Sequence, residues 1–248
     1  MKFWRVAMGL FVGFATLLAF LAPNAASFRS AMFARIMFVH VPSAMITSIA
    51  LIGAAVIGVK YLRTRDLKLD ASMAAAIEIA AMFSVITMLT GILFSKTQWG
   101  EWWQNDPRQL SFMMVMFFYL ALMVARSAFP DPQKRASASA GYAVALLIPA
   151  LFLIFVFPRL PQVKSFHPND TLPKGQLDQW YGITLLLNFI ALSWVTGVLY
   201  KLRVKVGVLE LKGGIDEHGS DHSGDSESHC VVRPVALSQE PGSTHEES

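Results

Sequence analysis

MAAAIEIAAMFSVITMLTGILFS, residues 73–95, contains one charged side chain, Glu78. About 20 predominantly apolar residues in a helix are enough to cross a bilayer, so this stretch reads as a transmembrane helix. Five further stretches have a similar length and little charge: 3–22, 36–59, 109–129, 139–158 and 180–200. The sequence therefore predicts an all-α membrane protein with six transmembrane helices.

The composition agrees with a lipid environment. Hydrophobic residues make up 54% of the chain and charged residues only 15%, whereas about 25% is usual in soluble domains. A formal net charge of +4 is too small to indicate nucleic-acid binding. Cys230 is the only cysteine, which excludes a disulfide within the chain and a CxxC redox pair.

The basic residues predict the topology. They precede the first span, lie between the second and third and between the fourth and fifth, and follow the sixth: Lys2, Arg5, Lys60, Arg63, Arg65, Lys68, Arg126, Lys134, Arg135, Lys201, Arg203 and Lys205. The positive-inside rule then puts both termini in the cytoplasm. The connections 23–35, 97–110 and 159–179 face outward. Residues 22–27 also resemble a signal-peptide cleavage site, but the apolar run before them is longer than a signal usually has, which favours an uncleaved span.

Two parts of the chain are expected: a membrane domain, 1–205, and a polar cytoplasmic tail, 206–248. From Gly213 onward Gly, Ser, Asp, Glu and His dominate, which is typical of a disordered segment. The tail could bind a transition metal through its scattered ligands, His218, His222, His229 and Cys230. Their irregular spacing favours a plain solvated tail.

Glu78 is the one acid well inside a predicted span. Intramembrane carboxylates often serve ions or protons. Glu78 also lies near the cytoplasmic edge, where it can extend toward a basic residue. The second interpretation is favoured.

The outward connection 97–110 holds Trp99, Trp102 and Trp103, three of the six tryptophans. If the connection were helical, these rings and Asp106 would share one face, and Pro107 would end the helix. The result would be an aromatic shelf. Interfacial aromatic belts offer an alternative, but belt residues scatter among spans instead of clustering.

Two histidines outside the tail, His40 and His167, are expected on the same outward side. Taken singly, each is more often structural than a ligand. Together with an aromatic shelf they suit haem, because two neutral imidazoles can bind the iron from opposite faces. Arg108 is the natural partner for a propionate, and Asp106 would orient Arg108 or cap backbone donors. Further cations are expected on that side: Arg29, Arg35, Lys96 and Lys164.

The pattern Trp99-Gly100-x-Trp102-Trp103-x-x-Asp106-x-Arg108 resembles the signature of the WWD haem-handling proteins of cytochrome c biogenesis. Its position, the chain length and His40-Val41-Pro42 most resemble the CcmC family of haem exporter proteins, over roughly residues 1–205. The resemblance implies transient haem b at the periplasmic face of a bacterial inner membrane. His40 and His167 would be the axial ligands, and Trp99, Trp102, Trp103, Asp106 and Arg108 would hold the ring.

The resemblance also implies partners and no enzymatic activity. Haem would pass to a CcmE-like chaperone, with CcmA/CcmB-like ABC transporter subunits and a CcmD-like small protein nearby. The sequence carries no Walker motif of its own. It departs from the family pattern at Glu101, Asn105 and Gln109. The related CcmF and CcsA haem lyases are larger or carry more histidines.

Two other classes compete. A transporter or channel would use Glu78 in a translocation path, with the tryptophans as an interface anchor. A haem-dependent oxidoreductase passing electrons across the membrane needs a second haem, and the spans contain no histidine besides His40.

Overall fold

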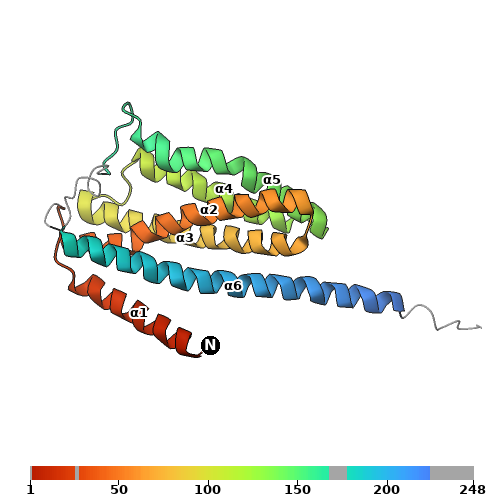
Figure 1. The fold of residues 1–248 in the computed structure, drawn as a ribbon. Helices are drawn as coiled ribbons and strands as arrows, with labels where there is room; N and C mark the ends of the chain where they lie inside the picture. The colour runs from red at the N-terminus through yellow and green to blue at the C-terminus, as the bar shows by residue number, and fades with distance from the viewer. Residues whose placement is uncertain (1, 26–27, 168–177, 224–248) are drawn as a thin grey trace, which may run out of the picture. The chain divides into compact units, whose positions relative to one another are not determined.

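The structure is a computed structural model that describes residues 2–25, 28–167 and 178–223. Within these ranges it contains helices and connections but no strand (Figure 1). The elements are α1 (Lys2–Leu21), the 3₁₀ helix η1 (Phe33–Ile36), α2 (Met37–Thr64), α3 (Leu67–Trp99), α4 (Pro107–Ser127), α5 (Pro132–Leu151), the π-helical turn η2 (Phe152–Val156), the 3₁₀ helix η3 (Phe157–Arg159) and α6 (Gln179–Ser223).

Six helices in the described ranges are long and apolar enough to cross a membrane. Each overlaps one of the spans predicted from the sequence, so the prediction of a six-helix membrane protein is confirmed. The fifth span runs from Pro132 through η2 and η3 to Arg159.

Helix α6 is longer than the span predicted at 180–200. It continues to Ser223, past residue 205, where the polar tail was expected to begin. Val206, Val208 and Leu209 continue the apolar content of the span before the polar residues take over. Residues Met1–Leu211 form one compact unit and Lys212–Ser248 another. The metal hypothesis for His218, His222, His229 and Cys230 concerns side chains outside the described part.

Three helices begin in the same way, with an aspartate as N-cap. Asp66, Asp106 and Asp131 are extended, and each accepts a hydrogen bond from a backbone N–H two or three residues later, at 2.6–2.9 Å. Pro107 and Pro132 then occupy the first turn of α4 and α5, where a missing N–H has no cost. Local sequence thus fixes where α3, α4 and α5 start.

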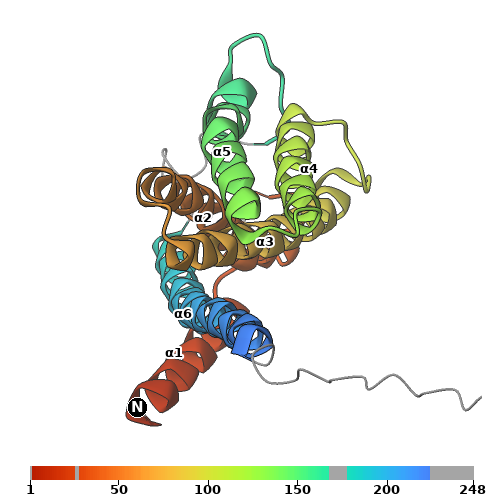
Figure 2. The same ribbon diagram turned by 90° about the vertical axis from the view of Figure 1, so that its right-hand side faces the viewer.

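Helices α2, α3, α4 and α5 lie side by side and form most of the core (Figures 1 and 2). Small residues let α2 and α5 approach closely. A Cβ added to Gly58 would lie 3.3 Å from the carbonyl oxygen of Ala140, and Ala136, Ala140 and Ala143 are fully buried. Close contact of backbones through small residues is the usual packing of membrane helices.

Helices α1 and α6 bury little of their surface. In the most apolar 18-residue stretch of each helix, only 6% is buried in α1 and 11% in α6, against 50% in α2 and α3. Trp4 packs edge-on against Trp194 at 6.1 Å, and Asn188 donates to the carbonyl of Ala15 at 3.2 Å. Most of their apolar surface is therefore free to face lipid or other helices.

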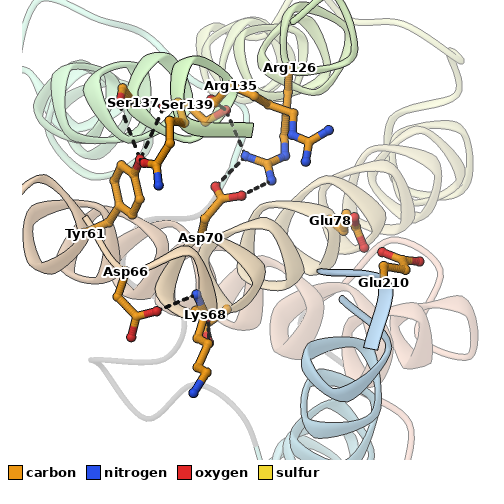
Figure 3. Close-up of polar contacts among 12 residues, drawn as sticks. Tyr61, Asp66, Lys68, Asp70, Glu78, Arg126, Arg135, Ser137, Ser139 and Glu210 are labelled. Atoms are coloured by element: carbon orange, nitrogen blue, oxygen red, sulfur yellow. Dashed lines mark hydrogen bonds and ion pairs between the residues drawn. The ribbon is translucent and has the colours of Figure 1, made fainter. Parts of the chain in front are cut away.

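Ionic contacts tie the helices together near the starts of α3 and α5 (Figure 3). Arg126 on α4 donates two hydrogen bonds to the buried Asp70 on α3, at 2.7 and 2.6 Å, and a third to Ser139 on α5. Glu78 accepts two from Arg203 of α6, at 2.6 and 2.8 Å. The interpretation of Glu78 as the partner of a basic residue is confirmed.

Candidate functional site

A cavity of about 390 Å³ lies where α2 begins, α3 ends and α4 begins. Its wall is mainly apolar, built from phenylalanines and methionines that include Phe28, Phe94, Phe112, Met37, Met45 and Met88. The polar side chains in the wall include His40, His167, Arg108, Arg159 and Gln109. The structure thus brings together three of the residues singled out from the sequence, two of which are more than 120 positions apart in the chain (His40 and His167).

His40 lies in the first turn of α2 and is fixed by α3. Its Nδ1 is 3.1 Å from the carbonyl oxygen of Thr87 and 3.0 Å from Oγ1 of Thr90. A carbonyl oxygen can only accept, so Nδ1 carries the proton and Nε2 keeps its lone pair. Metal-binding histidines usually show this arrangement, with the second nitrogen donating to a carbonyl or carboxylate.

Gly91 provides the room that the His40 ring needs. A Cβ at this position would lie 3.1 Å from Cε1 of His40, closer than side chains normally pack. A glycine on the neighbouring turn of α3 therefore lets the imidazole sit against the helix that holds it.

His167 is held by Asp106. The Nδ1 atom of His167 donates to Oδ1 of Asp106 at 3.2 Å. The same carboxylate accepts from the backbone N–H of Phe166 at 2.5 Å and from the hydroxyl of Ser165 at 2.9 and 3.1 Å. Nε2 of His167 is again the nitrogen left with a lone pair, so both histidines present the same atom to a ligand.

Asp106 is fully buried and remains ionised. Burial alone would raise the pKa of its carboxyl. The hydrogen bonds from His167, from the N–H of Phe166 and from the hydroxyl of Ser165 outweigh burial and hold the pKa well below its usual range. Asp106 caps a backbone donor, as expected from the sequence, because it accepts from the N–H of Arg108 at 2.9 Å. Its larger role, anchoring residues 165–167, was not foreseen.

The prediction of a helical aromatic shelf is wrong. Helix α3 ends at Trp99, because Gly100 adopts the left-handed conformation at φ 93°, which glycine tolerates best. Residues 101–106 are not helical, and Asn105 also has a positive φ of 51°. The three tryptophans therefore do not share a helix face.

Of the three tryptophans, Trp99 alone has a ring contact with a histidine in the described part of the chain. Its ring meets that of His167 edge-on at 5.1 Å. Trp102 is 55% exposed and lies 5.7 Å from the ammonium of Lys96. Trp103 donates from its indole N–H to Asn105 at 2.7 Å. Among the described residues, the cavity wall includes none of the three tryptophans.

The cations near the cavity differ from those expected. Arg108 lines it, as predicted, and has electrostatic contact with Asp106. The described wall does not include Arg29, Arg35, Lys96 or Lys164; Lys96, for instance, donates to the carbonyl of Gly100 instead.

Arg159 lines the cavity and was missed. It directly follows the fifth span as predicted from the sequence, 139–158, and that position could have identified it as an outward cation. Gln109, noted only as a departure from the family pattern, also lines the cavity.

The donor set limits what can bind. The described residues contain no group of three or more His, Cys, Asp or Glu side chains placed to hold a metal ion. Two imidazoles whose Nε2 atoms have no hydrogen-bond partner among the described residues suit a metal that arrives with other ligands of its own, inside a flat apolar molecule. The wall of phenylalanines and methionines would receive such a molecule.

Known proteins resemble this chain over part of its length. Heme exporter protein C of Bradyrhizobium diazoefficiens is 29% identical over 143 residues, 56% of this chain and 53% of the relative. The protein of that name from Escherichia coli (strain K12) is 28% identical over 142 residues, 56% of each chain. The matched region thus spans a little over half the length of these relatives. The family model of CcmC, described as heme exporter protein C, matches residues 1–215, and the chain belongs to this family.

Proposed function

We propose that this protein binds haem in the cavity and passes it on, with Nε2 of His40 and Nε2 of His167 as the two axial ligands. The observation that carries the proposal is that the two imidazole rings have the same location and the same hydrogen-bonding pattern. Both line one apolar cavity, and both donate from Nδ1 to a fixed acceptor. Haem b, held without a covalent bond, supplies the four remaining iron ligands.

The wall chemistry supports haem over a bare metal ion. Aromatic and thioether side chains pack well on a porphyrin face, and Arg108 offers a guanidinium to a propionate. Trp99 would meet the ring on the side of His167. Trp102 and Trp103, in the connection that ends at Asp106, would cover the part of the ring that projects from the cavity.

The proposed setting is the inner membrane of a bacterium. The distribution of basic residues supports cytoplasmic termini and, with them, a cavity at the periplasmic face. The names of the relatives, heme exporter protein C, support haem handling for cytochrome c maturation. The partners would be a CcmE-like haem chaperone, CcmA/CcmB-like ABC subunits and a CcmD-like small protein. The chain would not act as an enzyme, because hand-off is an exchange of iron ligands.

The two ligands differ in how they are held, and this difference suits release. His40 belongs to a helix and bonds to the backbone of another helix. His167 belongs to a connection that is held through Asp106. We propose that His167 leaves the iron first during transfer.

Replacement of His167 with alanine should weaken haem retention while His40 still binds the iron. The protein, in lipid nanodiscs, is loaded with ferric haem and mixed with excess apomyoglobin, which captures released haem. We expect faster loss than from the wild type and an absorption spectrum of a single axial imidazole. An unchanged rate and spectrum would contradict ligation by His167.

A further inference from the structure

Gln109 is buried in the wall of the cavity without a hydrogen-bond partner. Its side chain is 7% exposed, it lines the cavity, and neither Nε2 nor Oε1 has a partner among the described residues. Buried polar groups are nearly always paired, since each unpaired one costs stability. A buried amide that faces a cavity without partners indicates a polar group on the ligand.

Gln98 shows how this chain satisfies a buried amide that has a structural role. Gln98 is 4% exposed. It accepts from the backbone N–H of Ser30 at 3.1 Å and donates to the carbonyl of the same residue at 3.0 Å. Both glutamines lie near the same connection, one at the end of α3 and the other at the start of α4. Of these two glutamines, Gln109 is the one whose amide has no hydrogen-bond partner among the described residues.

Arg159 supplies a positive charge to the same wall. It ends η3, and its Nη1 donates to the carbonyl of Phe155 at 2.8 Å, which leaves further N–H donors of the guanidinium for a ligand. Arg159 and Arg108 are close enough to repel each other electrostatically. No aspartate or glutamate is among the described residues of the wall. An anion in the cavity would be attracted to the guanidinium of Arg159.

We propose that Arg159 and Gln109 form a carboxylate site, which selects porphyrins with free carboxylates and binds the carboxylate that Arg108 does not. The proposal rests on the function proposed above and names two further specificity-determining residues. Arg159 supplies the charge, and Nε2 of Gln109 donates the second hydrogen bond. Oε1 of Gln109 then accepts an N–H of the guanidinium, so ligand binding satisfies both ends of the amide.

This role predicts an unusual effect of substituting Gln109 on the stability of the haem-free protein. Leucine has nearly the size of glutamine but no polar atoms. Gln109→Leu should therefore stabilise the protein without haem, because the unpaired amide is gone, and should weaken haem binding. A purely structural glutamine would show the opposite stability change, as expected for Gln98→Leu, which breaks two hydrogen bonds.

The test compares iron protoporphyrin IX with its dimethyl ester, in which both carboxylates are blocked. Affinities are measured in lipid nanodiscs for the wild type, Gln109→Leu and Arg159→Gln, with Gln98→Leu and Arg35→Gln as controls. Each variant is compared with the wild type for the same porphyrin, so that partition into lipid cancels. Melting temperatures of the haem-free proteins are measured in parallel.

We expect Gln109→Leu and Arg159→Gln to weaken binding of the free acid by roughly tenfold or more, as for loss of a hydrogen bond to a charged group, and to change ester binding less than about twofold. Gln109→Leu should raise the melting temperature, whereas Gln98→Leu should lower it. Equal effects on acid and ester, or a lower melting temperature for Gln109→Leu, would overturn the proposal. If the wild type shows a bis-imidazole spectrum and yet fails this test, only the carboxylate site is wrong; if the wild type binds neither porphyrin, the proposed function fails as well.

Discussion

Replacement of His40 with alanine will remove the six-coordinate, low-spin haem from this protein and leave at most a weakly bound, five-coordinate form. Of the two proposed ligands, His40 is the more firmly held, because its Nδ1 is fixed by the backbone of α3 through Thr87. Loss of a mere hydrogen-bond partner of a metal ligand costs about 10–100-fold in affinity. Loss of the ligand itself should exceed that range.

The measurement is a haem titration in nanodiscs, followed by absorption spectroscopy. Thr90→Val serves as a graded control, since it removes one of the two acceptors of His40 Nδ1 and leaves the carbonyl of Thr87. We expect it to weaken binding modestly and to keep the low-spin spectrum. Added imidazole should restore that spectrum in His40→Ala by entering the space left by the ring. A low-spin spectrum that survives His40→Ala without added imidazole would refute ligation by His40.

Asp106→Asn should release residues 165–167 and lower haem affinity by about 10–100-fold, the range seen when the carboxylate partner of a metal-binding histidine is lost. Four donors converge on this carboxylate. Asparagine replaces one acceptor oxygen with an NH₂ group, which opposes at least one of these donors. Asparagine is nearly as good an N-cap as aspartate, so α4 should keep its start and the loss should fall on His167.

Asp131→Asn is the matched control. Asp131 caps α5 through the N–H of Lys134 and does not line the cavity, so the substitution should leave haem affinity unchanged. If Asp131→Asn weakened haem binding as much as Asp106→Asn, the effect would come from general destabilisation and the anchoring role would be wrong.

The depressed pKa of Asp106 gives this anchor a defined pH range. Because its folded-state pKa lies below the value of about 4 in unfolded chains, the carboxylate stabilises the fold above that value. This contribution is lost only as the pH falls through the folded-state pKa. Between pH 5 and 8 Asp106 stays ionised, so any loss of haem in that interval must come from another group.

The membrane architecture could be predicted because it depends on the length of apolar runs, a property that short segments carry on their own. The same holds for the starts of α4 and α5, where Asp106-Pro107 and Asp131-Pro132 are local capping signals. The gathering of His40 and His167 could be anticipated from topology alone. Helix α6 extends beyond the span predicted at 180–200, because 206–211 still contains apolar residues.

The details of the site could not be predicted because they depend on contacts across the chain. The helical interpretation of residues 99–106 gave too little weight to Gly100, whose left-handed conformation ends α3. The hydrogen bond between Asp106 and His167 joins residues 61 positions apart, and no local sequence pattern predicts it. Arg159 was overlooked because its place in the cavity wall depends on how the chain folds through the π turn and the 3₁₀ turn after α5.

The central claim, that two histidines of this chain bind one iron, is tested most directly by counting the imidazoles on the metal. The protein is labelled with ¹⁵N in its histidines only and loaded with ferric haem at natural abundance. Pulsed electron paramagnetic resonance then separates imidazole nitrogens from the porphyrin nitrogens. We predict two coordinated imidazoles per iron in the wild type. A single imidazole, or none, would contradict the account.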